Sequence, residues 1–278
     1  MKRKVKTKVK GFRTTDGAGV KLVRVLGNLT TKEFDPILML DSFDSINPDD
    51  YTAGFPMHPH RGIETISYVS RGKMVHRDSL GNEAGISDGE VQWMNSGSGI
   101  MHEEMVPAAE RLLGVQLWLN LPAKDKMSKP SYNSIKNEDI KEIEIEGGKI
   151  RLLAGKYGEH EGYKGDYLSM DYYDIHLNAD AEVTLTMEED DSVMVFTLLG
   201  DVYIDGEHIE EKTAVKLTEG DSLTIKNGNE KAQVLYMNSR ALNEPVAWAG
   251  PIVMNTQEEL QKAFLELRSN TFIKETAE

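Results

Sequence analysis

Two short pairs of potential metal ligands stand out in the sequence. His58 and His60 lie in FPMHPHRG, and His102 and Glu104 lie in GIMHEEMV. Side chains two residues apart on a β-strand project from the same face, so each pair would present two ligands in one direction. The chain between the pairs is long enough to form several strands and return beside its start. Three imidazoles and one carboxylate therefore predict a site for a divalent metal.

A lone H-x-H is more often a surface or core pair, but the H-x-E pair downstream favours the metal interpretation. Three neutral imidazoles and one carboxylate suit Fe(II), Mn, Co, Ni, Cu or Zn better than Ca or Mg. On an octahedral metal, four protein ligands leave two open positions for water, dioxygen or a substrate with neighbouring hydroxyl and carbonyl oxygens. His76 is expected to lie behind a ligand, to be an alternative ligand, or to be exposed. The remaining histidines have no partner at ligand spacing and are interpreted as structural or surface residues: His160, His176 and His208.

Length and charge restrict the class of protein that carries this site. The chain has 278 residues, with 32 Lys and Arg against 46 Asp and Glu, a net charge of −14. Such an acidic chain is not expected to bind nucleic acid directly. Its length predicts two domains or one large β architecture. Cysteine is absent, so neither disulfides nor thiolates are available.

The basic N-terminal segment MKRKVKTKVK has two possible interpretations. It resembles the start of a signal peptide, but no apolar stretch follows it, and no run in the chain is long enough to span a bilayer. Its lysines alternate with Val5, Thr7 and Val9, which is typical of an edge strand whose charges oppose aggregation. We expect a soluble, cytoplasmic monomer with no membrane attachment.

The elements that would position the ligands are mostly strands. Short β-branched or alternating runs recur between Gly, Asn, Asp and Pro turn signals. One helix is expected at about 256–269, where Leu260, Phe264 and Leu267 recur near helical spacing, with Thr256 or Asn255 as the N-cap and Glu259 as its capping partner. The pattern predicts an all-β protein with a short C-terminal helix.

A weak internal repeat suggests two barrels of similar design. In both halves a strand is followed by a Gly turn, a further strand and another Gly turn, with Gly72 corresponding to Gly200 and Gly89 to Gly220. We expect a metal-binding barrel at 1–122, a polar linker at 123–137, a second barrel at 138–240 and an extension at 241–278. Counting from the glycines places four residues of the second half at the ligand positions, none of them histidine: Thr186, Glu188, Gln233 and Leu235.

The central segment HPHRGIETISYVSRGKMVHRDSLGNEAGISDGEVQWMNSGSGIMHEEM resembles the pirin family of the cupin superfamily. LMLDSF upstream and LNEPVAWAGPIVMNTQEELQKAF near the C-terminus resemble pirin segments too. The resemblance implies a bicupin, with two double-stranded β-helix (jelly-roll) barrels facing each other and one metal, iron or a similar ion, in the N-terminal barrel only. Its ligands would be His58, His60, His102 and Glu104. General cupins take their carboxylate from the first motif instead, where Glu64 shares the parity of His58.

The same resemblance implies a reaction. Pirins resemble quercetinases, and some are assigned quercetin 2,3-dioxygenase activity, an oxidoreductase reaction in which O₂ cleaves the central flavonol ring and carbon monoxide leaves. The substrate would be a small aromatic hydroxy-ketone, with Glu104 as ligand or as the catalytic base for its 3-hydroxyl. Four further residues could line the pocket: Asp41, Arg61, Met74 and Trp93. Other pirins are described as non-catalytic, metal-dependent regulators that bind a protein partner, which is the competing expectation.

Overall fold

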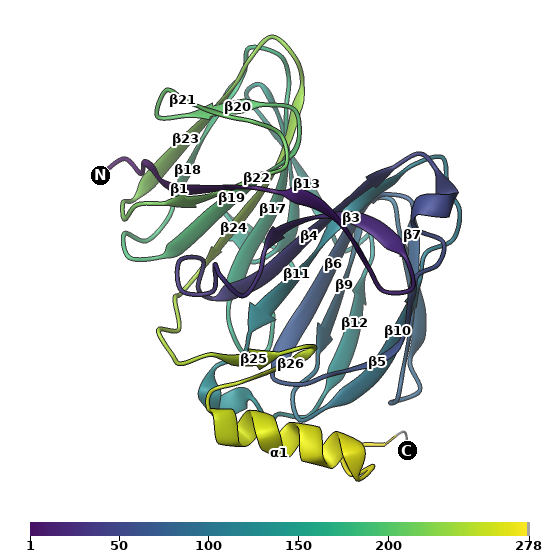
Figure 1. Cartoon of the computed structure of the whole chain (residues 1–278). Coiled ribbons are helices and arrows are strands. Elements are labelled where there is room, and N and C mark those ends of the chain that lie inside the picture. Colours follow the sequence, from purple (N-terminus) through teal and green to yellow (C-terminus); the bar gives the residue numbers. More distant parts are fainter. Residues whose placement is uncertain (277–278) are drawn as a thin grey trace. The chain divides into compact units, whose positions relative to one another are not determined.

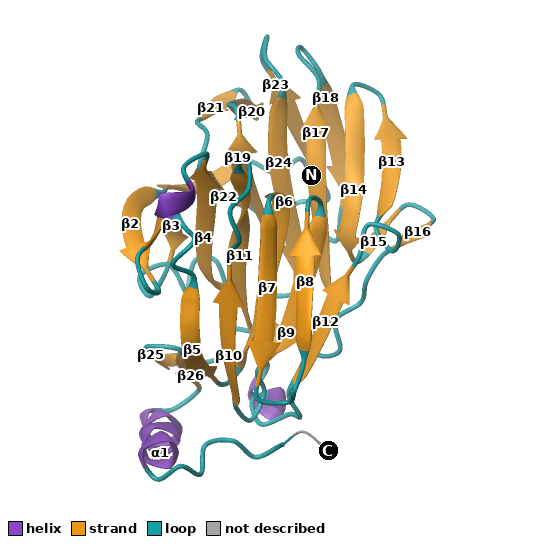
Figure 2. Cartoon of the chain, turned by 90° about the vertical axis from the view of Figure 1, so that its right-hand side faces the viewer, coloured by secondary structure: helices purple, strands orange, loops and turns teal. Residues whose placement is uncertain are grey.

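The computed structural model describes residues 1–276, and these form mainly β-strands with one α-helix (Figure 2). Contacts divide the chain into two compact units. Unit 1 contains residues 1–12, 32–36 and 137–241, and unit 2 contains residues 13–31, 37–136 and those from 242 onwards.

Unit 2 holds both pairs of candidate ligands and is built on two antiparallel sheets. The larger sheet has the order β12-β9-β6-β11-β4-β3-β2, with bounds β2 (Phe12–Asp16), β3 (Val20–Leu26), β4 (Ile37–Ser45), β6 (Ile63–Arg71), β9 (Glu90–Asn95), β11 (Leu112–Asn120) and β12 (Ser131–Ile135). The smaller sheet has the order β5-β10-β7-β8, with β5 (Phe55–His60), β7 (Lys73–Asp78), β8 (Glu83–Ser87) and β10 (Ile100–Met105). Short 3₁₀ turns lie at Pro48–Asp50 and Ala123–Asp125.

An apolar cluster fills one part of the unit 2 interior. Phe43 and Val69 from the larger sheet pack with Met74 and Ile86 from the smaller one, and all four are buried. Burying a side chain of this size contributes about 1.5–3 kcal/mol, so the cluster fixes the two sheets against each other. Other buried residues of unit 2 are polar, and they include the side chains of the candidate site.

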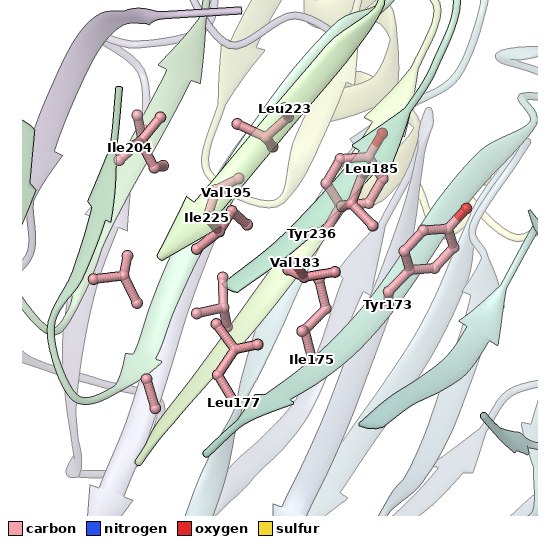
Figure 3. Packing of buried hydrophobic residues seen from close by; sticks show 14 of the residues in the cluster. Tyr173, Ile175, Leu177, Val183, Leu185, Val195, Ile204, Leu223, Ile225 and Tyr236 are labelled. Atoms are coloured by element: carbon pink, nitrogen blue, oxygen red, sulfur yellow. The ribbon is translucent and has the colours of Figure 1, made fainter. Parts of the chain in front are cut away.

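Unit 1 is a second two-sheet barrel with an apolar interior. One sheet has the order β1-β22-β19-β24-β17-β14-β13, with β1 (Val5–Lys10), β13 (Lys141–Ile145), β14 (Gly148–Ala154), β17 (Met170–Leu177), β19 (Ser192–Leu199), β22 (Thr213–Leu217) and β24 (Ala232–Ser239). The other has the order β18-β23-β20-β21, with β18 (Glu182–Thr186), β20 (Val202–Ile204), β21 (Glu207–Ile209) and β23 (Ser222–Asn227); a hairpin joins β15 (Lys156–Tyr157) and β16 (His160–Glu161). Figure 3 shows Ile175, Val195 and Leu223 among the side chains that fill the space between its strands.

The N-terminal strand does not belong to the barrel in which the sequence placed it. β1 pairs antiparallel with β22 at the edge of a unit 1 sheet, although residues 1–122 were expected to form the metal-binding barrel. The edge-strand interpretation of the basic segment is confirmed. Lys6, Lys8 and Lys10 form ion pairs with Glu33, Glu207 and Glu210, respectively, so these positive charges are matched locally.

The linker prediction differs from the structure in a similar way. The expected linker at 123–137 includes β12, which pairs with β9 and extends the larger sheet of unit 2. Polar side chains and Pro130 suggested a connector, but Ser131, Asn133 and Ser134 lie on a strand at the sheet edge, where polar residues are tolerated.

The predicted internal repeat is present in the order of the strands, but one of the two glycine correspondences differs from the prediction. Gly72 and Gly200 each end a long strand, β6 and β19, as predicted. Gly89 precedes β9, which pairs with β6 in the larger sheet of unit 2. Gly220 precedes β23, which lies between β18 and β20 in the smaller sheet of unit 1. The strand of unit 2 in the same position is β10, which lies between β5 and β7. Gly220 therefore corresponds to Gly99. The positions equivalent to His102 and Glu104 fall on β23 rather than at Gln233 and Leu235, and β23 contains no histidine.

The C-terminal segment packs onto unit 2 near the end of β5 (Figures 1 and 2). It contains the hairpin β25 (Ala247–Ala249) and β26 (Ile252–Met254), followed by α1 (Gln257–Arg268). The predicted helix is confirmed, and of the two expected N-caps it is Thr256 that forms the capping box with Glu259. Leu260 and Ala263 are its buried face.

Arg61 attaches this segment to the strand that carries the first ligand pair. Its buried guanidinium donates to Ser98 O at 2.7 Å and Phe272 O at 2.8 Å, and forms an ion pair with Glu266 at 2.8 Å. It also lies 4.2 Å from the Phe272 ring centroid, in cation–π geometry. Gly62 has φ +79°, and a Cβ there would meet Val253 O at 1.9 Å, so only glycine allows this close approach.

Candidate metal centre

Three imidazoles converge on one face of the smaller sheet of unit 2. In the β5–β10 ladder, His102 lies opposite His58 and Ile100 lies opposite His60. Because residues opposite each other share a face, the i, i+2 spacing of the sequence puts the three rings together. One ring nitrogen from each lies within 4.8 Å of the others, so these imidazoles could bind a metal ion.

Hydrogen bonds at the outer nitrogens fix how the inner ones point. His58 Nδ1 donates to Pro56 O at 2.8 Å, and His60 Nδ1 donates to Pro251 O at 3.0 Å. A carbonyl only accepts, so in the neutral rings both Nε2 atoms carry lone pairs, and these atoms lie 3.1 Å apart. His102 Nε2 is buried without a hydrogen-bond partner. Such a set of facing lone pairs fits a divalent cation.

Burial keeps the deeper rings neutral. His60 and His102 are buried, whereas His58 is only partly so. Loss of hydration, reinforced by the neighbouring His58, lowers the pKa of His60 to about 3. Burial likewise lowers the pKa of His102 well below its ordinary value. Neutral imidazole is the form that ligates metals, so the site is prepared in the folded chain.

These pKa values predict how acid affects the metal-free protein. Below about pH 6.5 the unfolded chain protonates both histidines while the folded chain does not, so stability falls as pH falls toward about 3. Each histidine contributes up to about 1.4 kcal/mol per pH unit in this window. In urea denaturation from pH 7 to 4, His60→Gln should show a shallower loss than the wild type. His160→Gln, at an exposed position, is the control; equal slopes for all three proteins would contradict the prediction.

Glu104 lies on the same face of β10 as His102, but its carboxylate is bound by two side-chain amides. Its carboxylate accepts hydrogen bonds from Gln92 Nε2 and from Gln116 Nε2, the latter at 3.0 and 2.9 Å to the two oxygens. Ser67 Oγ in turn accepts from both amides. The carboxylate is buried, and it is not part of the group of atoms within 4.8 Å that the imidazoles form.

The amides belong to a polar row that crosses the larger sheet. Register places five residues side by side on neighbouring strands: Arg24, Asp41, Gln116, Ser67 and Gln92. Asp41, expected in the pocket wall, lies in this row and is bound by Arg24 at 2.9 and 2.7 Å. Met74 touches Gln92, with Nε2 and Sδ 3.5 Å apart, while belonging to the apolar cluster. The structure thus brings both residues to the interior that holds Glu104.

Three other sequence candidates point elsewhere. Glu64 accepts a hydrogen bond from Trp93 Nε1 at 3.0 Å, and it lies three residues before Ser67 on β6, hence on the opposite face. The parity that linked Glu64 to His60 is lost because the chain turns at Gly62 and enters a different sheet. Trp93 shares that outer face, and Arg61 binds the C-terminal segment, so neither lines the interior with Glu104.

The remaining histidines separate into one neighbour of the site and three residues that belong to unit 1. His76 is fully buried and lies beside His102, with their Nδ1 atoms 3.4 Å apart. In unit 1, His176 and His208 pair with Asp174 and Asp201, respectively, and His160 is exposed. Residues that sequence reasoning missed are Asp78, Gln92, Gln116 and Pro251; the two glutamines were visible as polar interruptions in the apolar runs VQWM and GVQLW.

Two strand-built barrels, one presenting converging imidazoles, define a protein of the bicupin class. The family model described as Pirin matches residues 19–119, and that of the Pirin C-terminal cupin domain matches residues 172–273. The chain belongs to the pirin family. Within the described residues, no helix is both long and apolar enough to cross a membrane.

Similar proteins carry two kinds of name. A Pseudomonas aeruginosa protein named "Putative quercetin 2,3-dioxygenase" is 39% identical, over 93% of this chain and 94% of its own. "Pirin" of Homo sapiens is 35% identical, over 96% and 93%, respectively. Among solved structures, a quercetin 2,3-dioxygenase from Acinetobacter baumannii has a TM-score of 0.90 at 30% identity, covering 98% of this chain and 99% of that one.

Proposed function

We propose that this protein is a metal-dependent dioxygenase that uses O₂ to cleave a flavonol such as quercetin. The convergence of three imidazole nitrogens beside a buried carboxylate carries the proposal. The names of the similar Pseudomonas and Acinetobacter proteins support the substrate class. The products would be a ring-opened ester and carbon monoxide, so flavonol and O₂ balance the reaction without another reductant.

The residues that would hold the metal are His58, His60 and His102, with Glu104 as the proposed fourth ligand. When bound, a divalent metal, iron in our proposal, supplies Lewis acidity toward the hydroxy-ketone oxygens and a contact for dioxygen. His58 is the least buried of the three imidazoles, so substrate would approach from its side. The buried polar row behind Glu104 would orient the flavonol and keep bulk water out.

Glu104 would also receive the proton of the flavonol 3-hydroxyl. The amides of Gln92 and Gln116 donate to its carboxylate and hold it in a fixed position. A positioned base of this kind is effective because the acceptor oxygen needs no reorganisation when the substrate binds. Once protonated, Glu104 could return the proton to the ring-opened product.

The first test is the number of metal ions that each chain binds. We expect one, because unit 2 carries the imidazole cluster and the interior cluster of unit 1 consists of apolar and tyrosine side chains. Elemental analysis of freshly isolated protein, together with the measured chain concentration, would give the ratio. Two tightly bound metals per chain would contradict the assignment to unit 2 alone.

Oxygen uptake with quercetin after iron reconstitution tests the reaction itself. Uptake above that of free iron supports the enzyme. If the metal binds at one per chain and no uptake is seen, the alternative holds: a metal-dependent regulator that acts through a protein partner.

A further inference from the structure

His102 differs from the other two imidazoles in the group that holds its outer nitrogen. The Nδ1 atoms of His58 and His60 face backbone carbonyls, which can only accept. The Nδ1 atom of His102 instead faces Nδ1 of His76 at 3.4 Å. An imidazole nitrogen can donate or accept, so the donor in this hydrogen bond depends on a further group that fixes the tautomer of one ring.

Asp78 determines the direction of the hydrogen bond between His76 and His102. Its Oδ1 accepts from the backbone N–H groups of Leu80 at 2.9 Å and Asn82 at 3.1 Å, and the Asn82 side-chain amide donates to both of its oxygens. A carboxylate surrounded by donors is an acceptor, so the hydrogen in the 2.9 Å contact between His76 Nε2 and Asp78 Oδ2 sits on the imidazole. Nδ1 of neutral His76 is then the acceptor, and Nδ1 of His102 is the donor.

The direction of this hydrogen bond determines which nitrogen of His102 carries a hydrogen. With its hydrogen on Nδ1, His102 presents an unprotonated Nε2, which is the buried atom that has no hydrogen-bond partner. In the opposite tautomer, Nε2–H would point at the other imidazoles and block a metal.

The three residues are held on adjacent strands. His102 lies directly opposite Asp78 in the β10–β7 ladder, and Glu104 lies opposite His76. The His76 ring is fully buried and stacks on Tyr132, with centroids 4.1 Å apart and an interplanar angle of 13°. The hydrogen-bonded chain therefore has little freedom to rearrange.

We propose that Asp78 and His76 are positioning residues that fix His102 in its metal-binding tautomer and strengthen it as a ligand. The inference rests on the proposed function only in requiring that His102 binds the metal. Carboxylate partners of ligating histidines raise ligand basicity, and removing such a partner typically weakens metal binding about 10–100-fold.

The test compares two substitutions of His76 that separate hydrogen bonding from packing. His76→Phe keeps a ring to stack on Tyr132 but offers no acceptor to His102. His76→Asn loses the ring but can place its side-chain oxygen near the former Nδ1 position. Both would be titrated with Co²⁺, and dissociation constants and visible absorption spectra recorded, with urea denaturation measured in parallel.

The two roles predict opposite orders of Co²⁺ affinity for His76→Phe and His76→Asn. If His76 positions His102, His76→Phe should bind Co²⁺ about 10–100-fold more weakly than wild type, and His76→Asn should recover most of the affinity. Asp78→Asn should be intermediate and should alter the Co²⁺ spectrum. If His76 only packs, His76→Asn should be the weaker binder, because it loses the stack, and that order would overturn the proposal.

One further variant separates failure of this inference from failure of the metal site. His102→Ala should lose Co²⁺ binding. If it does while His76→Phe and Asp78→Asn bind as wild type does, the metal site stands and the positioning role is wrong. If His102→Ala itself binds Co²⁺ normally, the proposed ligand set is wrong, and the positioning role fails with it. The tautomer is read directly from the ¹⁵N chemical shifts of His102, where a protonated Nε2 in the metal-free protein would overturn the proposal.

Discussion

Iron-loaded Glu104→Gln protein should consume oxygen with quercetin about 10²–10⁴-fold more slowly than the wild type, the range expected when a positioned base is removed. The substitution preserves size and one oxygen ligand while removing the group that would take the 3-hydroxyl proton. The surrounding amides can adapt, because Gln92 Oε1 is buried without a hydrogen-bond partner and could accept from the new amide after a flip. We therefore expect much of the metal to remain bound.

Glu103→Gln is the matched control for this prediction. Glu103 is the neighbouring residue on β10, lies opposite Arg77 and forms an ion pair with it at 3.6 Å, on the face away from the amides. Its substitution should leave oxygen uptake within a few-fold of wild type. Full activity in Glu104→Gln combined with loss of activity in Glu64→Gln would show that the wrong carboxylate had been chosen.

The second large effect concerns the metal itself. His58→Ala and His102→Ala should each lose most of the bound metal, a greater loss than the about 10–100-fold that follows removal of a surrounding partner. Unit 1 should stay folded in both variants, because its strands bury their own apolar interior. Elemental analysis would report the metal, and hydrogen exchange along β17, β19 and β24 would report the fold of unit 1.

These two variants should differ from each other in stability. His102 is buried, so its truncation leaves an internal cavity, whereas His58 is partly exposed and water can fill the space. We expect the lower denaturation midpoint for His102→Ala. Loss of exchange protection throughout unit 1 would show instead that the two units unfold together.

The grouping of His58, His60 and His102 could be predicted from sequence because it depends largely on a local rule. Alternation along a strand puts residues i and i+2 on one face, and β5 and β10 each obey it. The rule failed for Glu64 because it holds only within one strand, and a turn at Gly62 separates Glu64 from His60. The strand-rich fold and the capped C-terminal helix followed from similarly local signals, whereas the bicupin class followed from the resemblance to the pirin family and from the internal repeat.

Contacts between distant segments were beyond such reasoning. Asp78 follows His76 at the same i, i+2 spacing, yet its role becomes visible only when β7 lies beside β10. Gln92 and Gln116 meet Glu104 across the barrel interior from two other strands. The pairing of β1 with β22 joins segments that are far apart in the sequence, and no periodicity within either strand specifies it.

The C-terminal segment contacts His60 and Arg61 at the end of β5, and this has a consequence for the order of events during protein synthesis. All three imidazoles leave the ribosome well before Pro251, the acceptor for His60, and before Phe272, which anchors Arg61. A nascent chain therefore carries the candidate ligands while Nδ1 of His60 still lacks its acceptor. Metal retention should mature only after the segment beyond Pro251 has been synthesised and docked, and premature termination in this segment should yield chains that acquire metal poorly although every ligand is present.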